Sequence, residues 1–214
     1  MKKHVFKFMP LSGIIGSILF ATTSLICGFL QPDYDTLNNF VSELGATNSS
    51  TESLMNYLGF IPSGILFSLF GLSLLMGVSK NLISRIGSLF IMLFGLGMTM
   101  AGIFSCDLGC PSGGTTESII HDRVSAVTFI SAIFGIILLG FSFKKMSIFK
   151  NISIYTICTG FVSLTFLIIM INSFESRNLT GLWQRLLLLS IFSWTIIASL
   201  RVFKNFDELK SNSD

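Results

Sequence analysis

The chain has 214 residues, of which 51% are hydrophobic and only 12% are charged. A soluble protein of this size needs more polar surface than such a composition provides, which excludes a soluble enzyme, a disulfide-stapled secreted domain and a disordered regulator. The formal net charge of +3 at pH 7 gives no argument for nucleic-acid binding, which requires a concentrated basic face. The sequence therefore predicts an integral membrane protein.

Six apolar stretches are long enough to cross a bilayer, whose hydrocarbon core of about 30 Å takes roughly 20 helical residues. They are not strands of a β-barrel, because barrel strands alternate apolar and polar residues, whereas residues 133–139 are apolar on every side. We predict an all-α polytopic membrane protein, in which residues 1–214 form a single six-helix domain that ends in a polar tail, residues 204–214. The predicted spans cover approximately residues 10–30, 54–78, 86–105, 124–143, 152–174 and 181–203.

The distribution of basic residues predicts the orientation, because cytoplasmic loops collect lysine and arginine. The amino-terminal segment, two of the connections and the tail carry most of them: Lys2, Lys3, Lys7, Lys80, Arg85, Lys144, Lys145, Lys150, Arg201, Lys204 and Lys210. The other connections hold most of the acidic residues and only Arg123, Arg177 and Arg185. We therefore predict that both termini are cytoplasmic and that the acidic loops face outward.

The first predicted span follows a basic start and contains Cys27, a combination that also occurs in lipoprotein signal peptides. Ile26 is too large for the position before such a cysteine, so we expect a retained helix. Within the spans, small residues recur four positions apart, as in Gly64 with Ser68 and Gly97 with Ala101. Such pairs allow close contacts between membrane helices.

The first outer loop has helical periodicity. Its apolar residues follow the spacing i, i+3, i+4, i+7, which places them on one face of a helix: Leu37, Phe40, Val41 and Leu44. Asp35 is suited to cap the start of a helix and Gly45 to end it. The pattern predicts a short amphipathic helix over residues 35–45, which lies on the membrane surface or folds over the bundle. The alternative is a solvated loop.

The second outer connection carries Cys106 and Cys110. Two cysteines this close on the oxidising side of a membrane favour a local disulfide. A thiolate metal site would need more soft ligands than the outer loops supply, because His121 is the only histidine there, and we predict no metal. A reduced pair without a special role is the remaining alternative.

Arg185 is the most informative single charge. It lies 16 residues before Arg201 on one predicted helix, which corresponds to roughly 24 Å and is shorter than a hydrocarbon core of about 30 Å. Arg185 is therefore expected inside the outer rim of the bundle, paired with Glu43, Asp107 or Asp122, because an unpaired charge there is costly. The alternative is an interfacial arginine that binds lipid phosphate.

His121 is expected to open the fourth span, with Ser125 and Thr128 following on one face of the helix. A lone histidine at a helix start usually has a structural role. However, several segments bring polar residues to the same outer rim: Glu43, Asp107, His121 and Arg185. Such convergence is what a binding pocket requires.

Several short motifs together resemble the DUF998 family of bacterial and archaeal membrane proteins. They are Ser42-Glu43-Leu44-Gly45, Leu54-Met55-Asn56 with Gly59-Phe60, the Cys106-Asp107 turn, the His121 helix start and Gln184-Arg185-Leu186. The resemblance spans nearly the whole chain and implies a multi-pass protein of a prokaryotic plasma membrane. Because the family name denotes unknown function, it implies no activity, substrate or cofactor. The matching polar positions are Glu43, Asp107, His121, Gln184 and Arg185.

Two functions are compatible with this cluster. The first is a non-catalytic protein that binds a lipid or small polar ligand in an outer-face pocket through Arg185 and His121. The second is an intramembrane lipid-modifying enzyme, a hydrolase or transferase, with His121 as general base, Asp107 or Glu43 orienting it or holding a metal ion, and Arg185 holding phosphate. One histidine and dispersed carboxylates favour the first function, and membrane lipids are the expected partners.

Overall fold

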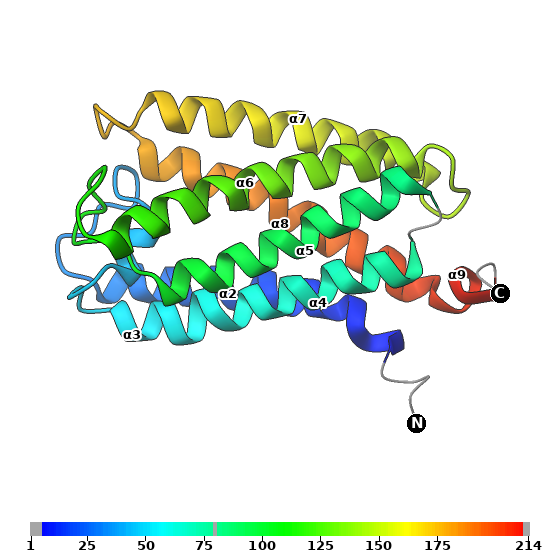
Figure 1. Ribbon diagram of the computed structural model, residues 1–214, viewed down its shortest axis with the longest axis horizontal. Coiled ribbons are helices and arrows are strands. Elements are labelled where there is room, and N and C mark those ends of the chain that lie inside the picture. The colour runs from blue at the N-terminus through cyan, green and yellow to red at the C-terminus, as the bar shows by residue number, and fades with distance from the viewer. Residues whose placement is uncertain (1–5, 79–80, 212–214) are drawn as a thin grey trace.

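A computed structural model describes residues 6–78 and 81–211 of the chain, and these residues form helices joined by loops (Figure 1). Within these described residues, six helices are long and apolar enough to cross a membrane, which confirms the predicted all-helical fold. The long helices are α2 (Ser12–Leu30), α4 (Ile61–Gly77), α5 (Leu82–Ile103), α6 (Thr116–Phe143), α7 (Lys150–Asn172) and α8 (Thr180–Lys204). The short elements are η1 (Met9–Leu11), η2 (Val41–Gly45), α3 (Glu52–Leu54), the π-helical turn η3 (Met55–Phe60) and α9 (Phe206–Ser211).

The helices pack mainly against their neighbours in the sequence. From α4 to α8 each helix contacts the next, while α2 contacts both α4 and α8 and so completes the bundle. Aromatic side chains fill the space among α2, α4 and α8. Phe67 stacks on Phe192 with ring centroids 5.3 Å apart, and Phe20 meets Phe192 edge-on at 5.7 Å.

Helix α6 begins about two turns earlier than the predicted span. The side-chain oxygen of Thr115 accepts a hydrogen bond from the backbone N–H of Ser118, which caps the helix at Thr116. The span was predicted from apolar residues alone. Because residues 116–123 include charged side chains, they were not counted as part of the helix. His121 therefore lies in the second turn of α6, and its predicted place at the helix start is wrong.

The first loop contains less helix than predicted. Instead of a helix over residues 35–45, the structure has turns followed by the 3₁₀ helix η2. Asp35 accepts a hydrogen bond from the backbone N–H of Leu37, and its own N–H donates to the Asn39 side chain. These local bonds compete with helix formation. Of the two predicted placements, the structure has the one over the bundle, because most residues of η2 are buried.

The start of the described chain, before α2, and α9 lie at the same end of the bundle as the connection over residues 144–149 (Figure 1). The tail is not only polar: it forms α9, in which Leu209 is buried, and Asp207 pairs with Lys7 at 2.8 Å. Three connections lie at the opposite end, over residues 31–51, 104–115 and 173–179 (Figure 1). We call these three connections the loop cap.

The orientation of this bundle gives the first testable prediction. A cysteine placed at the exposed Ser176 of the loop cap should react with a membrane-impermeant maleimide in intact cells. A cysteine at Ser147, which is exposed at the other end, should react only after the cells are opened. The opposite labelling pattern would reverse the orientation and place the loop cap inside the cell.

Candidate functional site

Glu43 organises the first connection of the loop cap. Its side chain is buried, and the oxygen Oε1 accepts the backbone N–H of Phe40 at 2.9 Å. The other oxygen, Oε2, accepts a hydrogen bond from Asn39 Nδ2 at 2.9 Å. These bonds fix the turn that precedes η2. Glu43 is thus held in place by its own loop before it meets any other segment.

Arg177 joins the three connections of the loop cap. Its guanidinium pairs with Glu43 Oε1 at 3.1 Å and donates to the carbonyl oxygens of Gly109 at 2.9 Å and Cys110 at 2.7 Å. It also lies 4.7 Å from the centre of the Phe40 ring. From the sequence, Arg177 was expected only to be one of the few basic residues of the outer connections. Nothing in its surroundings in the sequence indicates that it makes these contacts.

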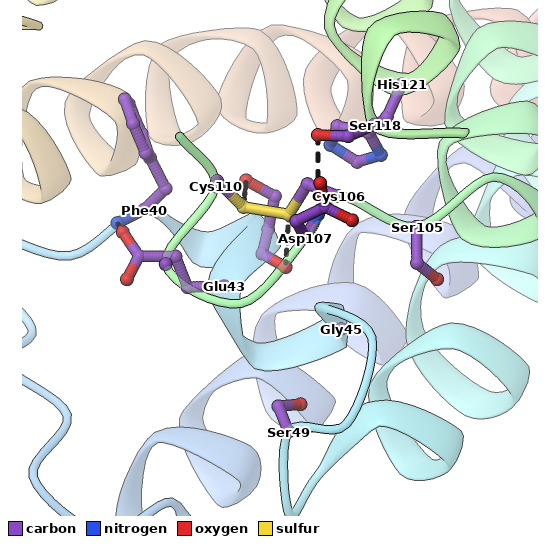
Figure 2. The surroundings of a disulfide bond; sticks show 12 residues. Phe40, Glu43, Gly45, Ser49, Ser105, Cys106, Asp107, Cys110, Ser118 and His121 are labelled. Atoms are coloured by element: carbon purple, nitrogen blue, oxygen red, sulfur yellow. Dashed lines mark hydrogen bonds between the residues drawn. A yellow bond between two sulfur atoms is a disulfide. The ribbon is translucent and has the colours of Figure 1, made fainter. Parts of the chain in front are cut away.

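Cys106 and Cys110 are joined by a disulfide (Figure 2). The disulfide closes the turn whose Gly109 and Cys110 carbonyl groups bind Arg177. The Ser42 hydroxyl lies 3.5 Å from the sulfur of Cys110. The Cys106 carbonyl accepts the backbone N–H of Thr47 at 2.9 Å. The disulfide turn is therefore packed against the first connection at several points.

Asp107 and His121 stabilise helix ends. Both carboxylate oxygens of Asp107 accept hydrogen bonds from Thr115, one from its N–H and one from its hydroxyl, each at 2.8 Å. The ring nitrogen Nδ1 of buried His121 lies 2.7 Å from the carbonyl oxygen of Phe104 and 3.1 Å from that of Ala101. Because a carbonyl only accepts, Nδ1 carries the proton. His121 thus satisfies carbonyl groups at the end of α5.

Gln184 and Arg185 hold the first connection against the start of α8. Gln184 Oε1 accepts the backbone N–H of Val41 at 2.6 Å. Arg185 Nη1 donates to the carbonyl oxygens of Asn39 at 3.1 Å and Gly181 at 2.9 Å, and Nη2 donates to the hydroxyl of Tyr34.

Tyr34 supports this arrangement from the loop side. Its hydroxyl donates to the carbonyl oxygen of Phe40 at 2.9 Å while it accepts from Arg185. Burial raises the pKa of Tyr34 to about 12, although the positive charge of Arg185 favours the ionised form. Tyr34 is therefore a neutral donor at physiological pH. Tyr34 was not among the polar residues predicted from the sequence.

The predicted acid partner of Arg185 is wrong. Glu43 pairs with Arg177, Asp107 binds Thr115, and Asp122 is exposed on α6. Within residues 6–78 and 81–211, the groups bonded to Arg185 are two carbonyl oxygens and one hydroxyl. Its charge is consequently solvated mainly by dipoles of the protein. Among the described residues no carboxylate forms an ion pair with it, although Asp35 interacts with it electrostatically.

The structure divides the five predicted residues into two groups. The first group holds residues 39–43 and comprises Glu43, Gln184 and Arg185. The second group holds the second connection and comprises Asp107 and His121. Arg177 links the two groups through Glu43 and the disulfide turn. In the described part of the chain, histidine, cysteine and acidic side chains form no group of three that would suit a metal ion.

The buried position of Glu43 gives a prediction about pH. Burial raises its pKa above the ordinary value near 4.5, although the Phe40 N–H and Arg177 favour the carboxylate. A group with a raised folded-state pKa contributes stability at low pH, and this contribution is lost as the pH rises through that pKa. The stability of the wild type relative to Glu43→Gln should therefore fall as the pH rises from about 4.5 towards neutrality.

Denaturant unfolding of both proteins in detergent over this range measures the effect. Glu43→Gln is the matched control, because every other titrating group is shared and cancels in the difference. A difference that grows in favour of the wild type at higher pH would show that the pKa of Glu43 is lowered.

Comparisons with known proteins agree with the resemblance found in the sequence. The model of the family DUF998, described as a protein of unknown function, matches residues 14–201. Neither the curated proteins nor the solved structures contain a match to the chain. The family match covers most of the chain, from α2 to the last turn of α8. The protein therefore belongs to the DUF998 family of multi-pass helical membrane proteins.

Proposed function

We propose that this protein binds a lipid or small polar ligand at Arg185, on the outer face of a prokaryotic plasma membrane. The observation that carries the proposal is that, within the described residues, Arg185 forms no ion pair with a carboxylate. A charge at the rim of a membrane bundle costs several kcal/mol unless it is paired. An anionic group of a ligand would provide the pairing that the described residues do not.

The surroundings of Arg185 favour binding because they hold the guanidinium in one orientation. Two carbonyl oxygens and the Tyr34 hydroxyl fix its position, and Tyr34 is itself held by the carbonyl of Phe40. A side chain that is already ordered loses little conformational entropy when a ligand arrives.

The alternative, a lipid-modifying enzyme, has less support. Because Nδ1 of His121 donates to carbonyl groups at the end of α5, only Nε2 could act as a general base, and the His121 side chain is buried away from solvent. The carboxylate of Asp107 is occupied by Thr115. No described hydrogen bond or ion pair joins either residue to Arg185. The two candidate catalytic groups thus have structural roles that explain them.

Native mass spectrometry of protein purified in a maltoside detergent tests the proposal. Wild-type protein should retain a co-purified ligand, and Arg185→Gln should lose it. Arg123→Gln is the matched control, because Arg123 is an exposed arginine on α6 and its removal should leave the ligand bound. Equal occupancy of a ligand in wild type and Arg185→Gln would contradict the proposal.

A further inference from the structure

We propose that the group bound at Arg185 is the phosphate of a membrane phospholipid, which reaches it from the lipid side between α2 and α8. This inference rests on the proposed function and specifies its ligand. It is based on the unused donors of Arg185, the depth of this residue along α8, and the exposed apolar side chains around it.

Arg185 has donors available for a ligand. A guanidinium carries five N–H groups. Within the described residues, Nη1 uses both of its hydrogens on carbonyl oxygens, and Nη2 uses one on Tyr34. The Nε–H and one N–H of Nη2 remain, and the side chain is only half-buried. Two such donors match an oxyanion with several acceptor oxygens, such as a phosphate or a carboxylate.

The position of Arg185 along α8 corresponds to the depth of lipid phosphates. Helix α8 has 25 residues, so it is about 38 Å long and exceeds a hydrocarbon core of about 30 Å. Arg185 follows the first residue of the helix, Thr180, by only about 7 Å along the axis. Near the other end, Arg201 donates to the carbonyl oxygen of Ile148 at 2.8 Å. The two arginines thus lie near opposite edges of the core.

The surface beside Arg185 is suited to acyl chains. Leu189, one turn further into α8, is 64% exposed, and Phe29 near the end of α2 is 89% exposed. Tyr34, which binds Arg185, packs beside Gly28 of α2, because a Cβ at Gly28 would lie 3.6 Å from its ring. Helices α2 and α8 contact each other. An anion that reaches Arg185 from this side passes exposed apolar side chains. Acyl chains attached to the anion would contact these side chains, which favours a phospholipid over a soluble carboxylate or phosphate.

The test measures binding of defined lipids to delipidated protein in maltoside detergent by native mass spectrometry. The probes are a short-chain phosphatidylglycerol and a glycosyl diacylglycerol with the same acyl chains but no phosphate. Phosphatidylglycerol should bind wild type and Arg123→Gln equally, and Arg185→Gln at least about tenfold more weakly. Arg185→Lys should be intermediate, because it keeps the charge and loses the planar pair of donors. Binding of the glycolipid should be weak and the same in all four proteins.

Other outcomes separate this inference from the proposed function. If the glycolipid binds as tightly and depends equally on Arg185, the site binds lipid but not through phosphate. If inorganic phosphate raises the melting temperature as much as phosphatidylglycerol does, the ligand is a soluble anion. Either result overturns the inference and leaves the proposed function intact. If no probe depends on Arg185, both fail. Should Arg185→Gln not fold, Arg185→Lys decides, since it retains the charge.

Discussion

Replacing Arg177 with alanine should lower the free energy of unfolding by about 2–3 kcal/mol. The change removes an ion pair, two hydrogen bonds to carbonyl groups and a contact with the Phe40 ring. It also leaves the buried carboxylate of Glu43 without its cationic partner. Loss of one member of a fully buried pair costs about 3–5 kcal/mol. We expect less here because the Arg177 side chain is 36% exposed and water reaches it.

Tryptophan fluorescence during unfolding in detergent measures this loss, and Arg123→Ala is the control for removing an outer arginine. The double variant of Arg177→Ala with Glu43→Gln should be less unstable than the sum of the single changes, because both remove the same ion pair. If Arg177→Ala unfolds like the wild type, Arg177 does not hold the connections of the loop cap together.

The number and order of the membrane helices were predictable from the sequence because length and hydrophobicity alone determine which segments can cross a bilayer. The same criterion failed at the start of α6. There the helix extends beyond the apolar stretch, and a threonine cap and a charged first turn determine where it begins. The prediction of a helix over residues 35–45 was wrong for a different reason. Their apolar spacing is helical, but side chains such as Asp35 bind nearby backbone groups and favour turns.

The sequence indicates which polar residues come near the same end of the bundle, but not which groups they bind. Gln184 and Arg185 were expected to lie in a polar cluster with Glu43, and in the structure all three hold residues 39–43 at one end of the bundle. That they form a ligand site stays a prediction. The prediction paired Arg185 with an acid because side-chain charges are visible in a sequence. Its actual partners are mostly backbone carbonyl groups, whose positions depend on how the first connection folds over α8. Arg177 was missed for the same reason, since two of its three hydrogen-bond partners are carbonyl oxygens.

A close contact between the backbones of α4 and α5 gives the second large prediction. Gly95 of α5 faces α4, and a Cβ at this position would lie 2.2 Å from the backbone nitrogen of Ser68 and 2.6 Å from the carbonyl oxygen of Gly64. The small pair Gly64 and Ser68 was predicted from the sequence to allow a close helix contact, but the glycine opposite them was not. Gly95→Ala should lower the free energy of unfolding by about 3 kcal/mol, because backbone atoms on both helices must move apart.

Gly77→Ala is the matched control for this change. Gly77 also lies in a membrane helix, at the end of α4, but a Cβ there would meet nothing within 4 Å. Alanine at this position restricts the unfolded chain without a clash, so it should be neutral or stabilise slightly. Thermal unfolding of the two variants in the same detergent separates the effect of packing from the effect of helix propensity. If both melted alike, α4 and α5 would separate at little cost, and small residues would not determine how closely these helices pack.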